Sequence, residues 1–256
     1  MNGILGLTFV FALFPILVGY ALRLWVSRTG TTPSDPNDRS VLTHSPALYP
    51  ICLLVGALGG VVFGLAVTPG IEALLTPLSN GLGVRLLRDA VAVALSEEVG
   101  KGLLLIALFA VGRIRTPLDG VILGVAAGTG FAAVENWFYF LAAFANEGSD
   151  AWWSSIRIRI GLSTWIHGTA SAALGAYLGA AWHHGRRDVR WAAPFGGVVA
   201  AWAVHGAWNG LLACSHPPGA EWLALLALCV PIASTLGVAT VVVRAIRERR
   251  AGVSSR

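Results

Sequence analysis

The feature that most constrains the fold of this chain is a series of apolar segments, each long enough to cross a lipid bilayer. A membrane-spanning helix needs roughly 20 mostly apolar residues, and hydropathy predicts about seven such segments in the 256 residues. Because 55% of the residues are hydrophobic and only 12% are charged, a soluble globular domain is excluded. We therefore expect an all-α fold, a polytopic transmembrane helical bundle, with spans at 3–25, 47–67, 87–112, 118–143, 156–182, 191–214 and 221–243.

These segments form one integral membrane domain over residues 1–256, since no repeat, low-complexity tract or soluble domain interrupts them. The N-terminal segment lacks a basic n-region and a small-residue cleavage site, so we interpret it as the first span rather than a signal peptide. A polar loop, 27–45, follows it. The mixed segment 68–83 predicts a loop with a short interfacial helix, or a re-entrant turn.

The arginines set the expected orientation. If the C-terminus lies inside, thirteen arginines fall in the inner loops and tail and four in the outer loops, as the positive-inside rule requires. We therefore expect an outside N-terminus and a cytoplasmic C-terminus in the cell membrane. The net charge of +5 lies in loops beside the spans, which favours the lipid bilayer as a partner and argues against nucleic acid. Arg157 and Arg159 are expected to anchor the outer interface, although Arg159 is near enough to the fifth span to reach inward.

The third predicted span contains Glu97, Glu98 and Lys101, the only lysine of the chain. Ionisable groups at this depth cost several kcal/mol to insert unless they find partners, so they mark a functional site. Glu97 and Lys101 are four residues apart and share a helix face, which predicts an ion pair between them. In this interpretation Lys101 is the charge partner that keeps Glu97 ionised, whereas Glu98 points to another face and needs a different partner.

Three further spans carry polar groups well inside their ends. Glu135 and Asn136 lie in the fourth span, His167 in the fifth, and His205 and Asn209 in the sixth. At ~1.5 Å rise per residue, most of these groups are expected roughly 12–17 Å below the outer surface. Any one of them is explained by packing, as a helix-helix contact or a core histidine. Their shared depth on four helices instead predicts a single buried site.

Two chemical interpretations of this site stay open. Two histidines and one or two glutamates can bind a divalent metal such as zinc and leave a position for water. Alternatively, a glutamate acts as general base on water, while histidine and asparagine polarise the developing oxyanion. Both schemes predict hydrolysis inside the membrane.

Four short motifs in order resemble those of the PrsW family of intramembrane proteases. Glu97-Glu98-Val-Gly-Lys101 resembles its E-E-x-x-K motif, and Phe131-Ala-Ala-Val-Glu135-Asn136 resembles its F-x-x-x-E-N motif. His167, followed by Gly175, resembles the third motif, and His205-Gly-Ala-Trp-Asn209 resembles the H-x-x-x-N ending. The match covers about residues 85–215. Lys101 and Glu135 favour this branch over the related CAAX prenyl proteases and bacteriocin-processing enzymes, which usually carry arginine and histidine there.

The resemblance implies a catalytic set made of Glu97, Glu98, His167, His205 and Asn209, the last as an oxyanion donor. It implies supporting roles for Lys101, Phe131, Glu135 and Asn136. It also implies that a divalent metal such as zinc is held by Glu98, Glu135, His167 and His205. Members of the family are described both as metalloproteases and as glutamate-type enzymes, so both schemes stay open. The flanking spans 3–25, 47–67 and 221–243 carry no motif.

We therefore expect an intramembrane endopeptidase that cleaves membrane-anchored proteins, such as regulators of the anti-sigma-factor type, near the outer half of the bilayer. The alternative function is a proton- or cation-coupled transporter that uses the same Glu/His cluster. Against it, the chain shows no internal repeat of the kind common in transporters. An inactive scaffold that binds transmembrane helices is also disfavoured, because it should have lost at least one motif residue.

Overall fold

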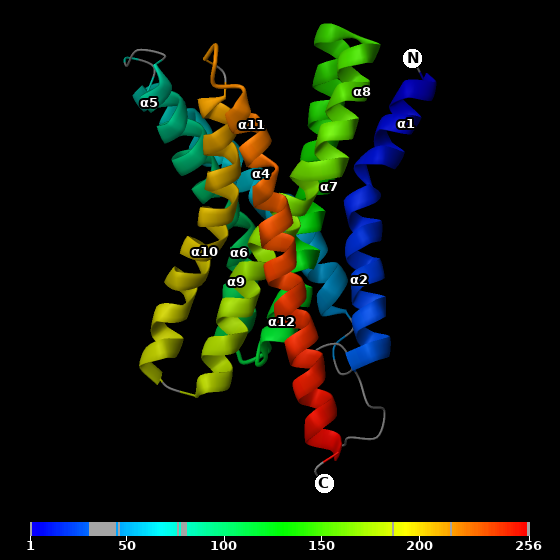
Figure 1. The fold of residues 1–256 in the computed structure, drawn as a ribbon, viewed down its shortest axis with the longest axis vertical. Helices are drawn as coiled ribbons and strands as arrows, with labels where there is room; N and C mark the ends of the chain where they lie inside the picture. Colours follow the sequence, from blue (N-terminus) through cyan, green and yellow to red (C-terminus); the bar gives the residue numbers. More distant parts are fainter. Residues whose placement is uncertain are drawn as a thin grey trace.

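The regular structure of this protein is entirely helical wherever the computed structural model describes it, namely over residues 2–30, 45, 47–75, 77, 81–185, 187–215 and 217–254. The helices pack side by side into one bundle, and the two termini lie at opposite ends of its long axis (Figure 1). The predicted all-α membrane bundle is confirmed. The side of the membrane on which each terminus lies stays a prediction, and most of the predicted loop 27–45 lies outside the described residues.

Five described helices are long and apolar enough to cross a membrane: Gly3–Arg28, Leu48–Leu75, Pro117–Glu147, Asp188–Cys214 and Trp222–Glu248. They correspond to the first, second, fourth, sixth and seventh predicted spans. The first consists of α1 (Asn2–Ala12) and α2 (Phe14–Gly30), and the others are α4 (Leu48–Leu75), α7 (Pro117–Glu147), α10 (Arg187–Cys214), and α11 (Trp222–Ala227) with α12 (Cys229–Ser254). Helix α4 continues past Pro69 to Leu75, so much of the segment expected as a loop is helical.

The third and fifth predicted spans are built differently, because each contains a π-helical segment before its main α-helix. The third is made of α5 (Leu82–Arg85), η1 (Leu86–Val93) and α6 (Ala94–Ala110), and the fifth of η2 (Arg159–Ser163) and α9 (Thr164–His184), preceded by α8 (Ser149–Ile158). Glu97 and His167 each lie four residues beyond the end of a π-helical segment. A π-helical turn changes the face on which later side chains lie and is frequent at functional sites.

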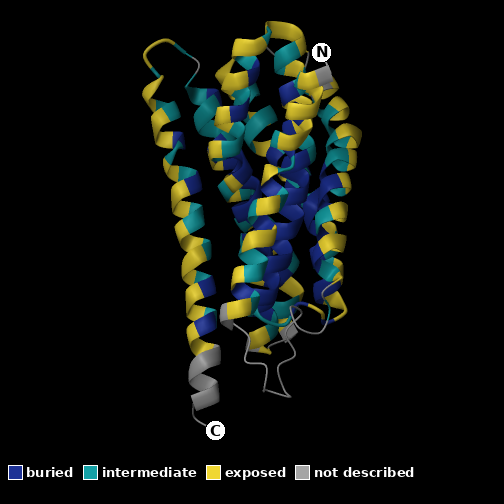
Figure 2. Ribbon diagram, turned by 90° about the vertical axis from the view of Figure 1, so that its right-hand side faces the viewer, coloured by how far each residue is buried: buried dark blue, intermediate teal, exposed yellow. Residues whose placement is uncertain are grey.

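Helix α7 occupies the centre of the bundle. Its most apolar window is 89% buried, compared with 17–28% for the other four membrane-length helices. Figure 2 shows the buried residues gathered in the middle of the bundle, while α12, the helix that ends at the C-terminus, is mostly exposed. A capping box between Thr116 and Asp119 and a proline at the first helical position, Pro117, define where α7 begins.

Small residues let α9 approach α7 closely. A stripe of glycines on α7 faces backbone carbonyls of α9: a Cβ atom on Gly120, Gly124 or Gly128 would overlap the carbonyl oxygen of Gly175, Ser171 or His167, respectively. Glycine stripes of this kind allow membrane helices to pack backbone to backbone. The last of these contacts is at His167 itself, so this packing fixes where α9 presents that histidine.

Candidate active site

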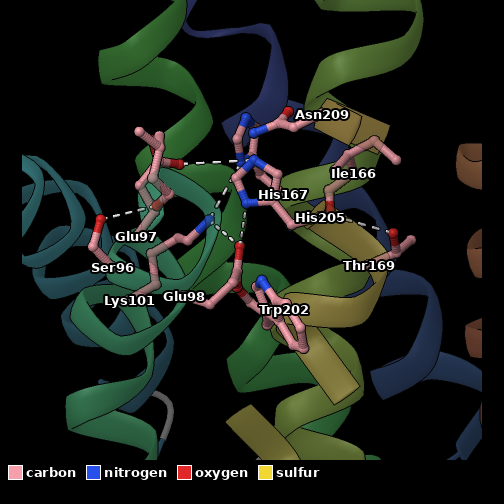
Figure 3. A network of polar contacts seen from close by, with 12 residues as sticks. Ser96, Glu97, Glu98, Lys101, Ile166, His167, Thr169, Trp202, His205 and Asn209 are labelled. Carbon is pink, nitrogen blue, oxygen red and sulfur yellow. Dashed lines mark hydrogen bonds and ion pairs between the residues drawn. The ribbon is translucent and has the colours of Figure 1, made fainter. Parts of the chain in front are cut away.

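The buried polar site is formed by side chains from four helices. Glu97 comes from α6, Glu135 from α7, His167 from α9 and His205 from α10. One ligand-type atom from each of Glu97, His167 and His205 lies within 4.8 Å of the others. The two imidazole rings meet edge to face, with centroids 4.8 Å apart, and Figure 3 shows both rings near Glu97, Glu98 and Asn209. The structure therefore brings together groups that are separated by more than 100 residues along the chain.

Glu98 and Lys101 form an ion pair at the base of the site, with both side chains fully buried. The Glu98 carboxylate also contacts His205 Nδ1 at 2.9 Å and accepts a hydrogen bond from Ser171 Oγ at 3.4 Å. The predicted pair between Glu97 and Lys101 is therefore wrong. Residues three apart on a helix are neighbours just as residues four apart are, and spacing alone could not choose between the two glutamates.

Lys101 is further held by the residues around its ammonium group. Its Nζ atom lies 3.3 Å from His167 Nδ1 and 4.3 Å from the centroid of the Phe131 ring. The same Phe131 ring packs edge to face against His167, with centroids 5.0 Å apart. Phe131 and Lys101 thus form one wall of the site, on the side of the imidazole that faces away from Glu135.

Glu97 has the opposite environment to its neighbour Glu98. Its Oε2 atom is buried and has no hydrogen-bond partner among the described residues. Its closest contact with an imidazole is His205 Nε2, at 3.9 Å. A buried carboxylate oxygen without a hydrogen bond is costly. Glu135 Oε2 also has no hydrogen bond in the described part of the chain, but it lies 2.5 Å from Arg159 Nη2 and 2.7 Å from His167 Nε2, so the Glu97 oxygen is the more available of the two.

The residues present fit a divalent metal ion. One carboxylate oxygen and two imidazole nitrogens are a donor set of catalytic zinc sites, which keep a further position open for water. A metal-binding histidine commonly holds a carboxylate on its other nitrogen, and Glu98 contacts His205 Nδ1 at 2.9 Å in this way. The two nitrogens of His167 face Glu135 Oε2 at 2.7 Å and Lys101 Nζ at 3.3 Å, so Glu135 lies on the side of the ring away from the ammonium group. The geometry adds Glu97 to the candidate ligands and places Glu98 behind His205, while the predicted ligand set, including Glu135, stays a prediction.

Asn209 has a different contact from the predicted one. Its Nδ2 atom donates a hydrogen bond to the carbonyl oxygen of Asp89 at 3.0 Å, and Trp202 Nε1 donates to the carbonyl oxygen of Ala90 at 2.8 Å. Both carbonyls belong to η1, so Asn209 and Trp202 dock α10 on the π-helical segment that precedes Glu97. Sequence reasoning missed Trp202. The only signal was its place three residues before His205, on the same helix face.

Two other residues of the site were missed or left undecided from the sequence. Ser171, which contacts Glu98, gave no signal beyond its spacing of four from His167. Arg159 was expected to anchor the membrane interface or to reach inward, and the structure shows the second arrangement, with its Nη2 atom 2.5 Å from Glu135 Oε2. Asn136 accepts a hydrogen bond from Arg159 Nε at 2.8 Å and donates one to Thr164 Oγ1 at 3.2 Å. The motif residue Asn136 therefore binds the start of α9 rather than the two histidines.

Comparison with known proteins agrees with this site. The family model described as the PrsW family intramembrane metalloprotease matches residues 44–242, which include the whole site and reach beyond the expected 85–215. No curated protein and no solved structure matches the chain. The family implies a divalent metal and protein substrates in the bilayer. The resemblance inferred from the four motifs is confirmed, and the chain belongs to the PrsW family of intramembrane metalloproteases.

Proposed function

We propose that this protein is an endopeptidase of the cell membrane that hydrolyses membrane-anchored proteins, and that Glu97, His167 and His205 hold its divalent metal ion. The observation that carries the proposal is the convergence of these three side chains from three helices, with their ligand-type atoms within 4.8 Å of one another. Membership of the family supports the reaction class. The donor set supports a zinc-like ion with an open position.

The residues behind the histidines orient them. A bound ion would polarise a carbonyl oxygen and lower the pKa of its water. Glu98 holds His205 at Nδ1, which leaves the Nε2 atom of that ring facing Glu97. Glu135 contacts His167 Nε2 from α7, while Lys101 Nζ faces the Nδ1 atom of the same ring. Lys101 compensates the Glu98 charge in the buried site, where an unpaired carboxylate would be strongly destabilising.

The substrate must present an extended segment to this site. A peptide bond within a membrane helix has its carbonyl hydrogen-bonded inside the helix, so a water molecule reaches it only where the helix is locally unwound. We propose substrates with a single membrane anchor, including regulators of the anti-sigma-factor type, cleaved near the outer half of the bilayer. This placement depends on the orientation predicted from the arginines.

The test combines metal analysis of the purified protein with cleavage of a single-span membrane substrate. The wild type should bind about one equivalent of zinc, and Glu97→Gln, His167→Ala and His205→Ala should each lose both the metal and cleavage. His183→Ala is the matched control, because His183 lies on α9 with His167 but is exposed and outside the site.

The outcomes separate the alternatives. Cleavage by a metal-free wild type, lost in Glu97→Gln, would overturn the metal assignment and leave Glu97 Oε2 as the general base. Full cleavage in all three site variants would overturn the active site itself. Ion-driven uptake into vesicles that is lost in Glu135→Gln, with no cleavage of any substrate, would instead support the transport alternative.

A further inference from the structure

Arg159 is a nearly buried cation at the start of the helix that carries His167. It is the first residue of η2, and its side chain is only 12% exposed. An arginine inside a membrane bundle is costly unless other groups satisfy its guanidinium. Arg157, two residues earlier, is instead exposed, and its Nη2 atom donates a hydrogen bond to Ser154 Oγ at 3.3 Å.

One turn of α7 contacts the guanidinium of Arg159 on several sides. Glu135 Oε2 lies 2.5 Å from Nη2, and Asn136 Oδ1 accepts a hydrogen bond from Nε at 2.8 Å. The Tyr139 ring lies beneath the group, with its centroid 3.7 Å from Cζ. A planar guanidinium can contact a carboxylate, an amide and a ring face at once, whereas an ammonium group cannot reproduce this arrangement.

The same Glu135 oxygen joins Arg159 to the active site. Glu135 Oε2 lies 2.7 Å from His167 Nε2 and 2.5 Å from Arg159 Nη2. A second bridge runs from Asn136 Nδ2 to Thr164 Oγ1, in the first turn of α9. These two bridges fix both the Glu135 carboxylate and the start of α9 against α7, and so they constrain the orientation of the His167 ring.

We infer that Arg159 is a positioning residue for the reaction: it holds Glu135 in the orientation that fixes His167. The inference rests on the proposed function, since it assigns Arg159 to that active site rather than to the membrane interface. It also gives Asn136 a role, because Asn136 holds Arg159 Nε. Without Arg159, the Glu135 carboxylate loses its cationic partner and is free to leave His167. Loss of such an outer contact typically lowers metal affinity or activity about 10- to 100-fold.

The experiment compares Arg159→Gln, Arg159→Lys and the control Arg157→Gln in the full-length protein. Zinc affinity is measured by chelator competition, kcat and KM on one single-span substrate, and the folded fraction by thermal unfolding. Arg159→Gln should lower zinc affinity and kcat about 10- to 100-fold at an unchanged KM. Arg159→Lys should be intermediate, because it keeps the charge but not the planar group. Arg157→Gln should match the wild type in all three measurements.

A double-mutant cycle separates positioning from general stability. In a Glu135→Gln background, Arg159→Gln should cause no further loss of zinc affinity or kcat, because the positioned group is already gone. If Arg159→Gln does not fold, the comparison of Arg159→Lys with the wild type in the same cycle decides the matter. A loss that only tracks the unfolded fraction, or additive losses in the cycle, would overturn the inference.

Failure of the inference and failure of the proposed function give different results. If the wild type binds zinc and cleaves while Arg159→Gln matches it, only the role of Arg159 is wrong. If the wild type neither binds zinc nor cleaves, the proposed function and the role of Arg159 both fail. If the wild type cleaves without zinc, the kcat measurements and the cycle still decide the inference.

Discussion

Helices α7 and α12 have similar lengths but opposite surroundings. The most apolar stretch of α7 is 89% buried, whereas that of the span Trp222–Glu248, which includes α12, is 17% buried. Figure 2 shows α12 with many of its residues exposed. Helix α7 carries glycines that face backbone carbonyls, together with Glu135 and Asn136. Helix α12 presents exposed apolar residues such as Ile232 and Leu236. An apolar surface is sufficient to place a helix such as α12 against lipid. A helix such as α7, which is surrounded by protein, also needs complementary shape and polar partners.

The charged pairs of the two regions show the same contrast. Glu98 and Lys101 are fully buried in the site, while Arg244 and Glu248 on α12 form a pair with side chains 80% and 65% exposed. A buried charge that loses its partner is strongly destabilising, but an exposed pair contributes little. The comparison therefore predicts large effects of substitutions in the interior and small effects of matched substitutions on α12.

The largest expected effect is that of Glu98→Gln, which leaves the Lys101 ammonium buried without its carboxylate. We expect a loss of about 3–5 kcal/mol in the free energy of unfolding, together with loss of cleavage. Arg244→Gln on α12 should change the free energy of unfolding by less than about 1 kcal/mol. Unfolding by SDS in mild detergent measures both variants.

A second variant tests the reason for this loss. Glu98→Gln combined with Lys101→Met removes both charges, so the free energy of unfolding should recover while cleavage stays absent. If Glu98→Gln were as stable as Arg244→Gln, the buried pair would not be the basis of the contrast.

A smaller loss is expected where α7 and α9 touch. Gly175→Val would place a side chain on the backbone of Gly120, so the helices must separate, at a cost of about 1–3 kcal/mol. Gly237→Val is the matched control, because a Cβ atom at Gly237 on α12 has no neighbouring heavy atom within 4 Å. Thermal unfolding of the two variants should give a lower melting temperature for Gly175→Val alone. Equal melting temperatures would mean that the close approach is not needed.

The contact between α10 and η1 should contribute less to the free energy of unfolding than the contact between α7 and α9. Trp202→Phe keeps an aromatic ring but removes the hydrogen bond to the Ala90 carbonyl, so we expect a loss of about 1 kcal/mol. Trp191→Phe, at a site 77% exposed on the same helix, should have no measurable effect. The same SDS titration compares the pair, and a stable Trp202→Phe variant would show that η1 does not need this donor.

The smallest effect is expected for Ile232→Ala on α12. Ile232 is exposed and therefore contacts lipid or detergent in the folded protein. Because its surroundings stay apolar when the bundle comes apart, the free energy of unfolding should change by less than about 0.5 kcal/mol. A loss as large as that of Gly175→Val would show that α12 packs more tightly than its exposure indicates.

Hydropathy and the four motifs were sufficient to predict the helical bundle, the five helices of membrane length among the described residues, and the family. Hydropathy depends only on the residues of one segment, and the order of the four motifs depends only on the sequence. Neither signal requires knowledge of how the helices pack. The residues that form the site were therefore visible in advance: Glu97, Glu98, Lys101, Glu135, His167 and His205. The third and fifth spans were located but not their π-helical segments, because a π-helical turn leaves little trace in the hydropathy pattern.

The contact partners of the charged and polar side chains in the site became known only from the packing of the helices. It paired Lys101 with Glu98, left Glu97 Oε2 without a hydrogen bond, and brought Arg159 to Glu135. It also directed Asn209 to the carbonyl of Asp89. These choices depend on the rotation of each helix about its axis, which follows from glycine contacts and π-helical turns at particular positions. Spacing along one helix names the candidate partners, but contacts between helices select among them.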